Sequence, residues 1–253
     1  MQRLYPGHVA DPDDGQLLGF YAPPPGPEPF VRFNFVATAD GAATHGGLSG
    51  ALGSAGDKRV FSLLRRFADV ILVGAGTIRS EGYGGELLDP ASRDWRLARD
   101  MAERPLLAVV TGKLDLDEDS ELFRLNPGEI LILTSSAADP AKEASLARFA
   151  EVLRCPLPGS AVDPLWIREV LAGRGHRVIH SEGGPHLLGA FQAASAIDSL
   201  CLTTAPLMAG GGAGRISAGA PGSELHRLAL HTLLEEDGNL LAEYRRVAET
   251  NGA

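Results

Sequence analysis

The stretch HSEGGPHLLGAF, residues 180–191, places a carboxylate, two glycines and a proline between an apolar run and the start of a helix. Pro185 fits the first helical position, where a missing N–H costs nothing, so Glu182, Gly183 and Gly184 are predicted to form a strand-to-helix loop. Glycines there let a ligand approach the main chain, and the free N–H groups of the helix start attract anions such as phosphate. The stretch therefore predicts either an anion-binding loop or a tight turn with an incidental glutamate.

A second glycine cluster, VILVGAGTIRSEGYGG, spans residues 70–85. It does not match the dinucleotide fingerprint, because Arg79 stands where GxGxxG requires its last glycine, nor the P-loop, because no Gly-Lys-Ser/Thr follows. A buried strand is expected to end at Gly74, with Thr77 as the cap of a helix whose free N–H groups face a ligand. Glu81 would lie one helical turn beyond Thr77. The alternative is a capped helix with a solvated glutamate.

The overall composition limits the class of protein and its partners. The chain has 253 residues and a net charge of −9, which argues against nucleic-acid and anionic-membrane partners because those need a basic surface. Cys155 and Cys201 lie far apart and outside any CxxC, so neither a disulfide framework nor a zinc site is predicted. The N-terminus does not resemble an export signal and no apolar run is long enough for a membrane span, so we expect a cytoplasmic protein without a membrane anchor.

Strand and helix patterns alternate along most of the chain. An alternating strand at 30–38 runs into a glycine-dense loop that is either flexible or ligand-facing, and an amphipathic helix with Ser54 as its N-cap follows. Further helices are predicted at 92–103, 140–152 and 163–175, the last with Asp163 as its N-cap. Further strands are predicted at 70–74, 106–110, 129–134, 177–180 and 199–207, with a final pair joined at an Asp-Gly turn.

This order predicts an α/β protein with three α/β/α layers, a mainly parallel central sheet and an antiparallel C-terminal edge hairpin. Residues 1–29 end in the proline-rich YAPPPGPEP, so we expect an extended arm that lies over the body. Residues 30–253 are expected to form a single domain. Arg65 and Arg66 fall on the amphipathic helix, where we expect a solvated face. The histidines show no metal-ligand spacing, so no metal site is predicted.

Four motifs, in their order and spacing, resemble a known family. They are FNFVATADGAAT, LLRRFADVILVGAGTIRSE, HSEGGPHLLGAF and IDSLCLTTAPLMAGGG. They are similar to the reductase domain of the riboflavin-pathway pyrimidine deaminase/reductase proteins, over about residues 30–247. The resemblance implies a dihydrofolate reductase-like fold, NADPH as the cofactor, a phosphorylated heterocyclic substrate and a homodimer.

The resemblance also implies residue roles. Asp40 is expected to be a proton source or a substrate-positioning group. Substrate contacts are expected from Asp40, Ser49, Lys58 or Arg59, and Glu182. Cofactor contacts are expected from Gly74, Gly76, Thr77, Glu81, Thr111, Gly112, Lys113, Val162, Gly183, Gly184, Pro185, His186 and Leu187.

Two departures from the family pattern bear on function. The zinc motif of the deaminase half is missing, so any deamination must come from another protein. Where many members read D-D-P-x-L-T, this chain reads SEGYGGELLD near the substrate, which leaves the exact pyrimidine open. The predicted function is NADPH-dependent reduction of a ribosylamino pyrimidine phosphate, of the 5-amino-6-(5-phosphoribosylamino)uracil type, to its ribitylamino form. The alternatives are reduction of another heterocycle such as dihydrofolate, and a non-catalytic nucleotide-binding regulatory protein.

Overall fold

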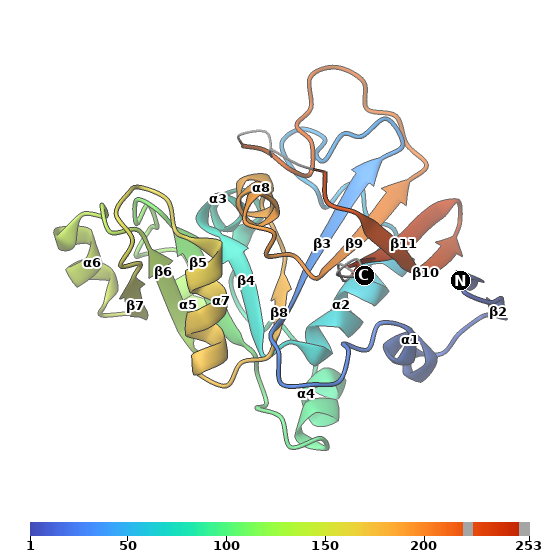
Figure 1. Cartoon of the computed structure of the whole chain (residues 1–253), viewed down its shortest axis with the longest axis horizontal. Coiled ribbons are helices and arrows are strands. Elements are labelled where there is room, and N and C mark those ends of the chain that lie inside the picture. The colour runs from blue at the N-terminus through green and yellow to red at the C-terminus, as the bar shows by residue number, and fades with distance from the viewer. Residues whose placement is uncertain (220–224, 248–253) are drawn as a thin grey trace, which may run out of the picture.

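One sheet runs through the computed structural model, which describes residues 1–219 and 225–247. Its eleven strands, all within those residues, follow the order β2-β1-β10-β11-β9-β3-β8-β4-β5-β6-β7. Figure 1 shows the strands side by side with helices packed on both faces. The α/β class and the three layers predicted from the alternating patterns are therefore confirmed.

Seven neighbouring strands are parallel, from β9 to β7. Successive residues of the apolar run Val70–Gly74 point to opposite faces of the sheet. Val70 and Leu72 pack against the helices α7 (Pro164–Gly173) and α8 (Pro185–Ala193), whereas Ile71 and Val73 pack on the other face near α5 (Glu121–Leu125). Both faces are covered, which explains why this strand carries no polar alternation. The parallel strands are β9 (Ser199–Ala205), β3 (Phe30–Thr38), β8 (Val178–Ser181), β4 (Val70–Gly74), β5 (Leu106–Thr111), β6 (Ile130–Thr134) and β7 (Glu151–Arg154).

The antiparallel hairpin is present, but it does not form the edge. β10 (Leu228–Glu236) and β11 (Asn239–Arg246) pair across Asp237 and Gly238, whose φ angles of 50° and 80° fit the predicted turn. β11 joins β9, whereas β10 pairs with β1 (Gln2–Tyr5), which in turn pairs with β2 (Val9–Ala10). The N-terminal strands therefore extend the sheet beyond the hairpin, and the predicted position of the hairpin at the edge is wrong.

The N-terminal residues differ from the extended arm expected for 1–29. After β1 and β2, the helix α1 (Asp14–Phe20) begins at a capping box made by Asp13 and Gln16. Leu17 and Leu18 of α1 are buried in the same cluster as residues of α2 (Ala55–Phe67). The prolines gather in 23–29, so the first twenty residues keep enough backbone donors to pair and to form a helix.

Several helices differ in extent from the patterns. α2 begins after Ser54 as predicted, because the Ser54 hydroxyl accepts from the Asp57 N–H at 3.1 Å. The predicted helix 140–152 ends early, and its last residues form the start of β7, a strand that the helical pattern hid. The shorter helices are α3 (Ala75–Thr77), the π-helical turn η1 (Ile78–Gly82), α4 (Pro90–Leu97), α5 (Glu121–Leu125) and α6 (Pro140–Leu146); the longer ones are α7 (Pro164–Gly173) and α8 (Pro185–Ala193).

Candidate functional site

A cavity opens at the carboxyl ends of the parallel strands, the edge at which open α/β sheets bind ligands. Its walls come from β3, the start of α2, the glycine-dense loop 43–53, the segment 80–87 and the loop 182–185. Phe35 and Phe61 line it together with Tyr83, so aromatic surface lies close to several charged groups. The glycine-dense loop thus forms part of the cavity wall.

The two glycine clusters meet beside this cavity. The Gly74 N–H donates to the Gly183 carbonyl at 2.9 Å, and a Cβ on Gly184 would lie 2.7 Å from the Thr77 hydroxyl oxygen. β8 ends at Ser181 and α8 begins at Pro185, so the predicted strand-to-helix loop is confirmed. Gly184 is the N-cap of α8 and has no side chain to occupy the first N–H groups.

The helix after β4 begins earlier than predicted. Gly74 is the N-cap of α3 and Thr77 lies within the helical stretch, so the prediction that Thr77 caps a helix is wrong. Glu81 accepts hydrogen bonds from the Ser49 N–H at 2.9 Å and from its hydroxyl at 3.0 Å. Two residues predicted to contact different ligands therefore contact each other in the cavity wall.

Glu182 is held by this chain's own donors. Arg65 binds both carboxylate oxygens, at 2.6 and 2.7 Å, and the Tyr83 hydroxyl donates to Oε2 at 2.5 Å. The Glu182 side chain is only 1% exposed, whereas the Arg65 side chain is 16% exposed. The predicted solvated face at Arg65 is wrong, and the groups next to Glu182 that reach the cavity are Arg65 and Tyr83.

Burial would raise the pKa of Glu182, but the charge and hydrogen bonds of Arg65 outweigh it, so the pKa lies below its usual range. Burial raises the pKa of Tyr83 well above its usual value, with the Glu182 charge adding to the effect. His180, two residues before Glu182, is fully buried, and desolvation lowers its pKa to about 4. Near neutral pH the cavity wall therefore carries an ionised Glu182 next to a neutral Tyr83, with the neutral His180 buried nearby.

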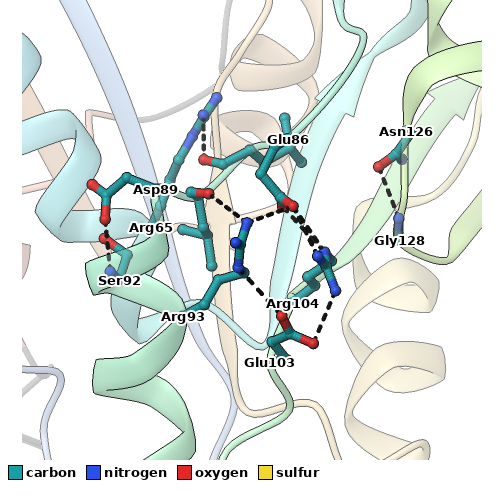
Figure 2. A network of polar contacts seen from close by, with 11 residues as sticks. Arg65, Glu86, Asp89, Ser92, Arg93, Glu103, Arg104, Asn126 and Gly128 are labelled. Carbon is teal, nitrogen blue, oxygen red and sulfur yellow. Dashed lines mark hydrogen bonds and ion pairs between the residues drawn. The ribbon is translucent and has the colours of Figure 1, made fainter.

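The segment 80–87, which departs from the family pattern, forms one wall of the cavity, and ion pairs and a hydrogen bond hold it in place. Figure 2 shows Glu86 between two arginines, with Arg93 at 2.6 Å and Arg104 at 2.9 Å. Both arginines also contact Glu103. Arg65 donates to the Leu87 carbonyl at 2.8 Å, which ties the segment to α2. The unusual sequence is therefore an anchored wall.

Of the two neighbouring basic residues predicted to contact the substrate, Lys58 lines the cavity. Arg59, its neighbour, turns away and donates to Asp14 of α1 at 2.8 Å, so the prediction of a substrate contact from Arg59 is not supported. Asp57 also lines the cavity, and its carboxylate accepts from the Thr203 hydroxyl at 2.6 Å. The sequence pattern marked Asp57 only as a first-turn residue of α2, because the helical spacing explained it without a ligand.

Asp40 lies outside the residues that line the cavity. Its carboxylate accepts from the Thr38 hydroxyl and from the Gly210 N–H at 2.8 Å, and ties the end of β3 to the loop after β9. The Thr38 hydrogen bond, helped by those backbone bonds, lowers the pKa of Asp40 to about 2. A carboxylate ionised in this way does not fit the predicted proton source.

The residues expected at the adenosine end of the cofactor lie along the same sheet edge, past the cavity. The Thr111 and Gly112 carbonyls accept from Thr134 and Ser135 at 2.7 Å each. Lys113 is exposed, whereas Val162 is buried in the core. At the start of α8, Pro185 lines the cavity and His186 is exposed, whereas Leu187 packs in the core and can offer a ligand only its backbone. Gly76, in α3, is exposed and has open space around it.

Across 1–219 and 225–247, no group of three or more His, Cys, Asp or Glu side chains is arranged to hold a metal ion. In the same part of the chain, no helix has the length and apolar character needed to cross a bilayer.

The fold and the cavity define an α/β protein of the dihydrofolate reductase-like class, as the four motifs predicted. A model of the family described as "RibD C-terminal domain" matches residues 29–238, and the chain belongs to this family. Riboflavin biosynthesis proteins RibD of Bacillus amyloliquefaciens and Mycobacterium tuberculosis are each 26% identical over 184 residues, which is 72% of this chain and 47% and 44% of those proteins. The chain thus spans about half the length of the curated relatives it matches.

Solved structures show the same fold. A pyrimidine reductase-like protein of Corynebacterium diphtheriae has a TM-score of 0.79 and 27% identity, covering 92% of this chain and 99% of that one. A riboflavin biosynthesis reductase of Saccharomyces cerevisiae has a TM-score of 0.69 and 18% identity, covering 93% and 100%. A deaminase/reductase of Thermotoga maritima has a TM-score of 0.67 and 18% identity, covering 87% and 57%.

Proposed function

We propose that this chain is an NADPH-dependent reductase of riboflavin biosynthesis that converts a ribosylamino pyrimidine phosphate to its ribitylamino form. The observation that carries the proposal is the contact between Gly74, Thr77 and Gly184, which leaves bare backbone beside a cavity. Membership of the RibD C-terminal domain family supports it. The substrate would be of the 5-amino-6-(5-phosphoribosylamino)uracil type.

The residues at the sheet edge fit a dinucleotide. NADPH, when bound, supplies the hydride for the reduction. The His186 and Leu187 N–H groups at the start of α8 would hold the pyrophosphate beside Gly184 and Pro185, because the first N–H groups of a helix attract anions and a side chain at Gly184 would meet Thr77. Thr111, Gly112 and Lys113 would bind the adenosine end, where the exposed Lys113 ammonium suits a 2′-phosphate.

The cavity suits the other substrate. Phe35 and Phe61 offer flat apolar surface for a heterocycle, while Arg65 and Tyr83 place hydrogen-bonding groups nearby. Lys58 is the lining cation whose side chain makes no hydrogen bond or ion pair with another described residue, and we assign the ribose phosphate to it. With the heterocycle and the ribose phosphate of the substrate both bound, its reacting carbon would be oriented against the nicotinamide.

We also propose that the protein acts in the cytoplasm as a homodimer. The family resemblance is the support for the dimer, and the composition is the support for the compartment. Sedimentation of the purified chain at twice the monomer mass is the expected result. A monomer at micromolar concentration would contradict the dimer.

One assay tests the activity. The absorbance of NADPH is followed with the ribosylamino pyrimidine phosphate, with dihydrofolate, and with neither; NADH replaces NADPH in a matched series. We expect turnover with the pyrimidine and a preference for NADPH. If dihydrofolate is turned over and the pyrimidine is not, the alternative of a reductase for another heterocycle is favoured, which the unusual sequence of the cavity wall 80–87 leaves open. Binding of NADPH without turnover of any substrate would favour the regulatory alternative.

A further inference from the structure

Asp57 is a half-buried carboxyl group that the predicted roles did not use. It stands in the first turn of α2 and reaches across to β9, where the Thr203 hydroxyl donates to Oδ1 at 2.6 Å. Thr203 is opposite Val36 in the pairing of β9 with β3, and Val36 lines the cavity with Asn34. Asp57 therefore lies on the cavity wall next to the central strands.

Its second oxygen is available to a ligand. No residue in the described part of the chain donates a hydrogen bond to Oδ2. Gly53 makes room for this oxygen, because a Cβ there would lie 2.5 Å from it. The oxygen is thus packed against Gly53, and both residues line the cavity.

The other carboxylates of the cavity wall are already engaged. Glu182 is bound by Arg65 and Tyr83, and Glu86 lies between two arginines. Glu81 accepts from both donors of Ser49. Asp57 alone among these four is held by a single neutral hydroxyl within the described residues, and it is the one best able to exchange a proton with a ligand.

The surroundings of Asp57 favour its protonated form. Burial raises the pKa of Asp57, and this effect exceeds the opposing effects of the Thr203 hydrogen bond and the Lys58 charge. A general acid works best when its pKa approaches the working pH. Asp40 has the opposite character, since its own loop keeps its pKa at about 2.

We propose that Asp57 is the catalytic acid of the reduction. This inference rests on the proposed function. NADPH, when bound, would supply a hydride to C1 of the open Schiff base and leave as NADP⁺. As the carbon–nitrogen double bond becomes single, Asp57 would give its proton to the nitrogen and regain one from solvent.

Few other titratable groups face Asp57. Lys58 is next to it on α2, and Tyr21, at the end of α1, lies close enough for the two charges to interact. Burial raises the pKa of Tyr21 well above its usual value, so Tyr21 stays neutral through the working range. Glu236 of β10 lies against Gly56 and is 3.6 Å from the N-terminal amine. A loss of activity with rising pH can therefore be assigned to Asp57.

The test compares Asp57→Asn with Asp94→Asn, an exposed aspartate of α4, and with Asp40→Asn. We expect kcat of Asp57→Asn to fall at least about 100-fold, with NADPH affinity within about threefold and the melting temperature retained. The decline of kcat with rising pH should disappear in Asp57→Asn and persist in Asp94→Asn. An Asp57→Asn protein that keeps the pH dependence, or an Asp40→Asn protein that loses it, would overturn the proposal.

A second readout does not need turnover. Calorimetry with 5,6-diaminouracil, the ring without ribose phosphate, is run over the pH range in which this probe does not titrate. The dissociation constant should vary with pH in the unchanged protein and become independent of pH in Asp57→Asn. Equal pH dependence in both proteins would overturn the role of Asp57. Absence of turnover with the pyrimidine phosphate alongside the expected binding result would instead count against the proposed function.

Discussion

Two arginine–glutamate pairs lie near His180, and they differ in what surrounds them. The inner pair, Arg32 and Glu243, joins β3 to β11 with 3.0 Å between Nη2 and Oε1. The cavity pair, Arg65 and Glu182, joins α2 to the loop before α8. Arg32 is opposite His180 in the pairing of β3 with β8, and His180 Nε2 lies 3.9 Å from Glu182 Oε1, so the histidine is close to both pairs.

The inner pair is closed to solvent. The side chains of Arg32 and Glu243 are 1% and 0% exposed. Ser199 donates to Glu243 at 2.7 Å, Arg245 donates to it as well, and Arg32 donates to the Tyr21 carbonyl. Every partner comes from the sheet or from the segment after α1, so this pair links the N-terminal region to the sheet.

The cavity pair has the same chemistry but an open side. Arg65 keeps 16% exposure and lines the cavity together with Tyr83, whose hydroxyl completes the set of donors to Glu182. Removing a partner from a buried pair leaves an uncompensated charge, which costs more where water cannot reach it. The comparison therefore predicts that the inner pair affects stability alone, while the cavity pair affects both stability and ligand chemistry.

The largest effect is expected from Glu243→Gln. This change leaves Arg32 without its carboxylate in a site closed to solvent, so the free energy of unfolding should fall by about 3–5 kcal/mol. Urea unfolding measures the change. NADPH affinity and kcat per folded molecule should stay within about twofold. A stable Glu243→Gln protein with impaired turnover would break the comparison.

His180 is expected to make the stability depend on pH. Its pKa is about 4 in the folded protein and about 6.5 when unfolded, so the unfolded state binds the extra proton between those values. The neutral His180 therefore favours the folded state less and less as the pH falls from about 6.5 to about 4, and the free energy of unfolding should decrease by about 3 kcal/mol over this range. The difference in unfolding free energy between the unchanged protein and His180→Phe, followed against pH, isolates this loss. Parallel curves would show that His180 does not titrate as a buried group.

Glu182→Gln is the matched change in the cavity pair. We expect about 2–3 kcal/mol less unfolding free energy and a similar loss of transition-state stabilisation in kcat/KM, because Arg65 and Tyr83 lose their common acceptor charge. NADPH affinity should stay within about threefold. Melting temperature, NADPH affinity and kcat/KM are measured on one preparation. A fully active but less stable protein would make the cavity pair structural, like the inner one.

The smallest effect is expected from Tyr83→Phe. The ring remains in the cavity wall, but Glu182 loses one hydrogen-bond donor. The transition-state stabilisation measured by kcat/KM should therefore fall by about 1–2 kcal/mol, and the melting temperature should change little. Because Tyr83 belongs to the segment that departs from the family pattern, the ratio of pyrimidine to dihydrofolate turnover is the sharper measurement. An unchanged kcat/KM and ratio would remove Tyr83 from the site.

The sequence predicted those parts of the molecule that local patterns determine. β4, β8 and the start of α8 follow from apolar runs ended by glycine and proline, and α2 follows from its spacing and its Ser54 cap. β7 and β1 have four residues each, too few for a period to show. The cavity pair joins residues 117 positions apart, and no pattern in either segment reports the other. Asp57 was hidden because its place in a helical turn already explained it.

NADPH binding by Gly184→Val tests the central claim, that the two glycine clusters form the cofactor cradle. A valine at this position would meet Thr77 and fill the space beside the first N–H groups of α8. Gly173→Val, at the end of α7 with no atom within 4 Å of a Cβ, is the matched control. Calorimetry should show NADPH affinity weakened more than about tenfold, or about 1.4 kcal/mol, in folded Gly184→Val and unchanged in Gly173→Val. Equal affinity in the two folded variants would contradict the account.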